Sequence, residues 1–318
     1  MEEQKQAKQQ MQIDSDILNT FSKAVRVAKE KGNLDRDEYK KGINASKTEA
    51  LFLLFEDALE EFKANSFIDE NFSTASTLLK GVDYTIKNIE DLCPRLSLSY
   101  TKETNSIGIF ISAAINKIIK ETDTINLDFA GIEVNYLGYY LTRGNLIIKG
   151  SVGGYTGHSM QSGSITIHGN AGDWTGRSMK GGSIIVDGNA GEDTGEYMRS
   201  GSITIHGNAG DATGRSMQSG SITIHGNAGK CTGDSMQSGS ITIHGNAGEY
   251  TGHSMEGGSI IVDGNAGNYV GIFSEGGEIK VNGEINGISN NAKAAIFCEG
   301  KRAKSIEYLN SRKVIHWV

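Results

Sequence analysis

The sequence predicts a helical N-terminal domain followed by a right-handed parallel β-helix of about nine coils, each nineteen residues long. Glycine recurs at a fixed spacing through more than half of the chain, and short alternating apolar segments lie between the glycines. Helical periodicity before residue 124 predicts the N-terminal domain. The expected boundaries are 1–124 for the helical domain, 125–295 for the β-helix and 296–318 for a C-terminal cap.

The glycines fall into three columns of period nineteen that stay in phase from residue 144 onward. One column begins at Gly144 and another at Gly157. The third precedes the "NAG" runs and includes Gly169, Gly188, Gly207, Gly226, Gly245 and Gly264. Three columns in phase indicate stacked repeats, because each repeat needs glycine at the same backbone positions.

Each repeat contains a segment such as "SITIH" (202–206), in which Ile203 and Ile205 face one side and the polar residues face the other. This alternation predicts a half-buried strand, and the "GNAG" that follows predicts a corner. Stacked repeats place parallel strands ~4.8 Å apart, with equivalent residues in ladders. The preferred crossover of parallel strands predicts the right hand. Isoleucine, valine and a methionine column from Met160 to Met255 are expected to fill the interior.

The expected N-terminal elements are less regular. In order they are helices at 15–32, at 51–62 after a capping box at 46–49, at 73–92 ending before Pro94, a short strand at 96–100, and a helix at 106–121. The first coil of a β-helix has an unpaired edge and an open apolar end. We therefore expect the helical domain to cover that end, and the tail after residue 295 to fold over the other.

An asparagine column follows the first glycine of each corner. Its members are Asn170, Asn189, Asn208, Asn227, Asn246 and Asn265. Stacked amides can donate to one coil and accept from another, which satisfies the corner backbone. We interpret the asparagines and the adjacent glycines as structural ladders.

The outer column after the strand carries three successive histidines, His206, His225 and His244. Asp187 and Asp263 flank them. Two stacked imidazoles could share a zinc or nickel ion, which makes these histidines candidate metal ligands. Side chains that leave one face in parallel rarely converge, so a solvated histidine ladder is the favoured interpretation.

A further column alternates in charge from coil to coil. It reads Arg177, Glu196, Arg215, Asp234 and His253. Each charge therefore meets opposite charges above and below, whereas a slip by one coil would bring like charges together. We interpret this column as a device that sets the register of near-identical coils.

Net charge, the lengths of the apolar runs and the cysteine count exclude several classes of function. The 318 residues carry a net charge of −7, which argues against nucleic acid or an anionic membrane as a partner. No apolar run approaches the ~20 residues that span a bilayer, and the polar start does not resemble a secretory signal. Three widely spaced cysteines favour free thiols and a cytoplasmic location. The sequence predicts no catalytic residue and no cofactor.

The repeats "G-x-I-x-(I/V)-x-G-N-A-G" and "G-x-x-M-x-(G/S)-G" resemble the glycine-repeat (GXGXG) β-helix domain of two families. These are the C-terminal domain of the glutamate synthase large subunit and the glycine-repeat subunit of formylmethanofuran dehydrogenase. The resemblance implies a scaffold against which catalytic parts pack. The favoured hypothesis is thus a non-catalytic scaffold that binds protein partners or itself. The alternatives are a structural subunit of a redox or amidotransfer complex, and a metal- or carbohydrate-binding module.

Overall fold

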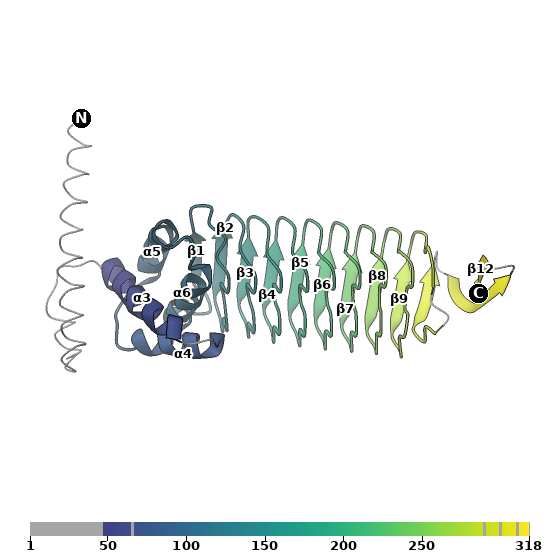
Figure 1. Cartoon of the computed structure of the whole chain (residues 1–318), viewed down its shortest axis with the longest axis horizontal. Helices are drawn as coiled ribbons and strands as arrows, with labels where there is room; N and C mark the ends of the chain where they lie inside the picture. The colour runs from purple at the N-terminus through teal and green to yellow at the C-terminus, as the bar shows by residue number, and fades with distance from the viewer. Residues whose placement is uncertain (1–46, 65–66, 289–290, 299–300, 310–311, 318) are drawn as a thin grey trace, which may run out of the picture.

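The computed structural model describes residues 47–64, 67–288, 291–298, 301–309 and 312–317. A group of helices packs against one end of a row of stacked parallel strands (Figure 1). This arrangement confirms the predicted fold class. The helix expected at 15–32 and Ser46 of the expected capping box lie outside the described residues.

Four helices are described in the N-terminal part. They are α3 (Lys47–Ala64), α4 (Ile68–Leu78), α5 (Ile86–Ser99) and α6 (Thr104–Ile118). Phe55 of α3 and Phe110 of α6 are fully buried and meet edge to face, with ring centroids 5.5 Å apart. The helices thus share one apolar core.

Helix α6 closes the first coil of the β-helix. It is buried continuously from Ile107 to Ile115, because the other helices cover one side and the coil covers the other. On the coil side, the Ser112 hydroxyl donates to the carbonyl of Tyr136 at 3.0 Å. The Asn116 amide donates to the carbonyl of Tyr139 at 3.0 Å. The predicted covering of this end by helices is confirmed.

Two details of the helical prediction are wrong. The expected single helix at 73–92 is divided between α4 and α5, which a turn containing Gly81 separates at a φ of +82°. Helix α5 also continues through Pro94 and includes most of the segment expected as a strand at 96–100. Ile89, Leu92 and Leu96 are fully buried at helical spacing on both sides of the proline. Their burial offsets the cost of proline in a helix, about 3 kcal/mol.

Ten parallel strands of the described chain follow in sequence order. They are β1 (Thr124–Asp128), β2 (Asn145–Lys149), β3 (Ser164–Ile167), β4 (Ser183–Val186), β5 (Ser202–Ile205), β6 (Ser221–Ile224), β7 (Ser240–Ile243), β8 (Ser259–Val262), β9 (Glu278–Val281) and β10 (Ala295–Cys298). From β2 to β9 every paired residue lies nineteen positions from its partner, as in Ile203 opposite Ile222. The repeat period is therefore the pairing register.

The C-terminal end differs from the regular coils. Strand β10 pairs in parallel with β9, and the predicted boundary after residue 295 falls inside it. Strands β11 (Lys301–Leu309) and β12 (Arg312–Trp317) then form an antiparallel pair next to β10. The predicted cap is thus a hairpin that extends the sheet.

The interior consists of stacked ladders. Inward-facing isoleucines and valines of strands β1 to β9 are at most 1% exposed, and all methionines of the predicted column are fully buried. A threonine column that the sequence analysis missed lies beside them: Thr156, Thr175, Thr194, Thr213, Thr232 and Thr251. Each hydroxyl donates to the carbonyl three residues earlier, so its burial leaves no unmet hydrogen bond.

Candidate interaction surface

The asparagine column lies exposed along a corner of the β-helix. The side-chain oxygen of each asparagine accepts from the backbone N–H of the residue nineteen positions later. The distance is 2.7–2.8 Å from Asn170 through Asn265. The bonds run from the backbone N–H to the side-chain oxygen, and they lie at the surface. The amides thus tie successive coils together.

The histidine column lies on the outer side of the strands. Ring centroids are 5.1 Å apart for His206 and His225, and 5.0 Å apart for His225 and His244. The acids at the ends of this row take hydrogen bonds from imidazoles: Nδ1 of His244 lies 2.6 Å from Asp263. Within the described residues, no group of three or more His, Cys, Asp or Glu side chains converges on a position for a metal ion.

A second outer surface is formed by the turn before the methionine column, and we call it the turn face. Three columns of residues make it. The first is Tyr136, Tyr155, Trp174, Asp193, Ala212, Cys231, Tyr250 and Tyr269. The second is Tyr139, His158, Arg177, Glu196, Arg215, Asp234 and His253. The third is Tyr140, Ser159, Ser178, Tyr197, Ser216, Ser235, Ser254 and Phe273.

The first and third columns have positive φ throughout, between +49° and +62°. Backbone in this left-handed region is uncommon for residues other than glycine. The tight turn holds these residues there because their N–H groups bond to the next coil, as Tyr155 does to the carbonyl of Asp173 at 2.8 Å. Successive side chains of a column therefore stack.

Ion pairs occupy the middle of the turn face. Arg177 Nε lies 2.9 Å from Glu196, and Arg215 Nη1 lies 3.1 Å from Asp193. Burial raises the pKa of both carboxyl groups, although the arginines act in the opposite direction. His253 Nδ1 lies 2.7 Å from Asp234 and extends the pairing. Opposite charges thus lie on neighbouring coils.

Aromatic rings occupy both ends of the turn face. At the N-terminal end, the rings of Tyr136, Tyr155 and Trp174 stack with centroids 4.7 and 4.8 Å apart. Helix α4 covers this end: Phe72 packs against Tyr139, with centroids 5.4 Å apart. The Tyr139 hydroxyl also donates to Asp69 of α4. One helix thus supplies both an apolar and a polar contact to these rings.

The aromatic rings at the C-terminal end have no such cover in the described chain. Tyr250 and Tyr269 stack with centroids 5.0 Å apart, and Phe273 lies edge to face with His253 at 5.9 Å. Tyr269 is 48% exposed and Phe273 is 54% exposed. We call Tyr250, His253, Tyr269 and Phe273 the aromatic end. Sequence reasoning followed His253 only as part of the charge column and missed the rings beside it, because residue identity changes along the first and third columns.

The lowered pKa of the buried His158 side chain should make the stability of the protein depend on pH. Burial, with Arg177 as the second cause, lowers the pKa of His158 to about 4 from an ordinary 6.5. As pH falls through that window, the unfolded chain takes up a proton that the folded chain does not. The free energy of unfolding should therefore fall by about 3 kcal/mol over the whole window, and by about 2 kcal/mol between pH 7 and pH 4.5. His158→Phe should remove this loss, measured by urea unfolding at about pH 7 and pH 4.5.

Other groups do not obscure the test. The raised pKa values of Asp193 and Glu196 act with the opposite sign, since the folded chain takes up their protons first. Both carboxyl groups are present in the wild type and in the variant, so the difference between the two proteins isolates His158. Equal pH dependence in the two proteins would contradict the assignment.

Together the stacked coils, the paired ladders and the helical cover define a capped parallel β-helix. No protein-family model matches the chain, and a search of curated proteins found no match. Among solved structures, one similar chain belongs to the formyltransferase/hydrolase complex of Methylorubrum extorquens, solved with methylofuran. It is 29% identical with a TM-score of 0.45, and the match covers 46% of this chain and 58% of that one. The match thus spans less than two thirds of that chain. None of the described helices has the length and apolar character needed to cross a membrane.

Proposed function

We propose that this protein is a non-catalytic scaffold that binds a protein partner through the aromatic end of its turn face. One observation carries the proposal. The same columns bear aromatic rings at both ends, and helix α4 covers those at the N-terminal end, while Tyr269 and Phe273 remain about half exposed. Exposed aromatic clusters are enriched at protein interfaces, where they supply most of the binding energy.

The covered end indicates the kind of partner. Phe72 of α4 contacts the rings of Tyr139 and Tyr140, and Asp69, one turn earlier, accepts from the Tyr139 hydroxyl. A partner helix with an aromatic residue and a polar residue three positions apart would fit the other end in the same way. The partner is either a different protein or a second copy of this chain.

Site-specific photo-crosslinking tests the proposal in cells. A photoreactive residue replaces Phe273 on the aromatic end, and a matched control replaces Thr223 on the outer side of the strands. We expect a discrete cross-linked protein from position 273 and none from position 223. Adding Tyr269→Ser should reduce the yield by about tenfold, as expected for loss of an aromatic hot spot. Equal labelling from both positions, or none from 273, would refute the proposal.

The resemblance in the glycine repeats suggests a finer form of the proposal, in which the partner is a catalytic chain of a redox or amidotransfer complex. In that case the cross-linked protein should carry flavin, pterin or an iron–sulfur centre. Absorption spectra of the purified assembly distinguish this form from a scaffold with a partner that holds no redox group.

A further inference from the structure

Three exposed imidazoles form an unbroken row on the outer side of the strands, and we call them the histidine row. His206, His225 and His244 directly follow β5, β6 and β7. The N–H groups of His225 and His244 both donate to the preceding strand at 2.8 Å, so the backbone beneath the row is fixed. The pairing of the strands therefore sets the distance between one imidazole and the next.

The spacing of these rings matches that of two imidazoles on one metal ion. Zinc binds imidazole nitrogen at about 2.0–2.1 Å, which at a tetrahedral angle places the two ring centroids about 5 Å apart. The centroids are 5.1 Å apart for His206 and His225, and 5.0 Å apart for His225 and His244. The ring planes meet at 53° and 33°, so the imidazoles are not parallel. Rotation of the exposed side chains can therefore bring two nitrogens to one ion without movement of the backbone.

Carboxylates at both ends of the row orient the outer imidazoles. Nδ1 of His244 lies 2.6 Å from Asp263, and Nδ1 of His206 lies 3.5 Å from Asp187. A carboxylate accepts from a ring N–H, so Nδ1 carries the proton and Nε2 keeps its lone pair for a metal ion. Histidine ligands of metal ions commonly have such a carboxylate partner, which fixes the ring and raises its basicity.

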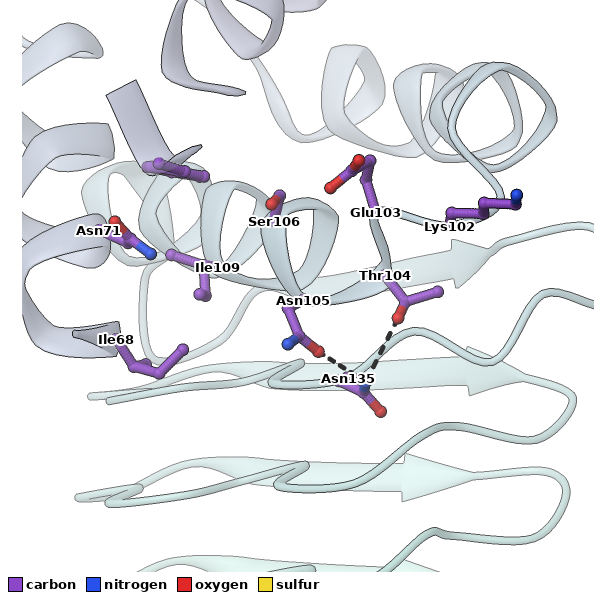
Figure 2. Close-up of a pocket in the computed structure, with 10 residues that line it drawn as sticks. Ile68, Asn71, Lys102, Glu103, Thr104, Asn105, Ser106, Ile109 and Asn135 are labelled. Carbon is purple, nitrogen blue, oxygen red and sulfur yellow. Dashed lines mark hydrogen bonds between the residues drawn. The ribbon is translucent and has the colours of Figure 1, made fainter. Parts of the chain in front are cut away.

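A hollow elsewhere in the described chain is a poorer position for such an ion. A pocket of about 510 Å³ lies where the helical cover meets the first coil (Figure 2). Neither histidine nor cysteine lines this pocket. The amide of Asn135 in its wall already donates to Asn105 Oδ1 at 2.7 Å and to Thr104 Oγ1 at 3.3 Å. Transition-metal ions prefer imidazole nitrogen, which the histidine row offers and this pocket does not.

We propose that the histidine row binds a divalent transition-metal ion, such as Zn²⁺, between two neighbouring imidazoles. His225 is a ligand in either pair, and His206 or His244 supplies the second nitrogen. Water completes the coordination, so the ion can accept a further ligand. The ring spacing favours this site over the solvated ladder that the sequence suggested. The row is separate from the turn face, so the site does not depend on the proposed scaffold function.

Calorimetric titration of the full chain with zinc sulfate tests the site. We expect the wild type to bind Zn²⁺, and His225→Asn should weaken binding by at least tenfold because both pairs lose their shared ligand. Asparagine already occupies this column at Asn282, so the melting temperature without metal should stay the same. Absence of Zn²⁺ binding by the wild type at concentrations up to about 1 mM would overturn the proposal.

His168→Asn is the matched control. His168 is an exposed residue of the same column, but its neighbour in the next coil is Asp187, whose carboxylate lies 2.7 Å from its Nδ1. This variant removes an imidazole without breaking a histidine pair, so it should bind Zn²⁺ as the wild type does. Electron paramagnetic resonance of bound Cu²⁺ should show two nitrogen ligands in the wild type and in His168→Asn, but not in His225→Asn. Equal Zn²⁺ binding by all three proteins would refute the assignment.

Discussion

Gly226→Ala should destabilise the β-helix by about 3 kcal/mol or more, because overpacking here meets backbone. A Cβ atom at Gly226 would lie 2.6 Å from the carbonyl oxygen of Gly207 and 2.5 Å from Asn208 Oδ1 in the preceding coil. The same carbonyl accepts from the N–H of Gly226 at 2.9 Å, so the coils cannot separate without losing this bond. Urea unfolding of the full chain measures the loss.

Gly150→Ala is the matched control in the same glycine column. Gly150 has a φ of +88°, but a Cβ there would meet nothing within 4 Å. Its replacement should cost about 1–2 kcal/mol, through the left-handed backbone alone. If Gly226→Ala costs no more than Gly150→Ala, then close approach of the coils is not what requires glycine in this column.

The β-helix could be predicted because every regular coil has the same residue types at the same positions. Ile203 and Ile222 are paired and buried in neighbouring strands, and the nineteen-residue spacing of the sequence is the pairing register itself. At the ends the spacing changes, to twenty-one residues between Thr124 and Asn145 and to seventeen between Glu278 and Ala295. The regular period therefore could not define the last coils.

The helical domain was harder to predict because the ends of its helices depend on single residues that do not repeat. Pro94 and Gly81 gave opposite errors: the proline was expected to end a helix that continues, and the glycine was expected inside a helix that ends before it. Local propensity predicts the proline error only, since glycine also disfavours a helix interior, whereas burial of Leu92 and Leu96 on one face of α5 depends on tertiary contacts. A sequence read alone does not contain those contacts.

The candidate sites depend on features that do not repeat. The charge column was visible as alternating signs, and the pairing of Arg177 with Glu196 agrees with that pattern. The aromatic end was not visible, because Tyr269 and Phe273 share columns with aspartate, alanine, cysteine and serine. The pocket under the helical cover is lined by α3, α4, α6 and the first coil, four segments that only the folded chain brings together. Functional differences thus lie where the repeats depart from one another.

Gly108→Ala should detach the helical cover from the first coil. Gly108 lies inside α6, and a Cβ atom there would lie 1.7 Å from the carbonyl oxygen of Asn135. Alanine favours a helix by about 1 kcal/mol relative to glycine, so local propensity alone predicts stabilisation. The close approach should outweigh this gain and cost about 3 kcal/mol or more. Hydrogen exchange should show loss of protection in β1, whose strand pairs with β2 on one side.

Displacement of α6 should also change the state of association. The hydrogen bonds from Ser112 and Asn116 to the first coil would be lost. Helix α5 packs on α6 and accepts from the N–H of Asn126 in β1 through Glu90, so its movement with α6 would make the edge of β1 accessible to other chains. Light scattering should then detect stronger concentration-dependent association than in the wild type. Gly81→Ala, at a φ of +82° with nothing within 4 Å of its Cβ, is the control and should leave β1 protected. Unchanged β1 protection in Gly108→Ala would show that α6 does not hold the end of the β-helix closed.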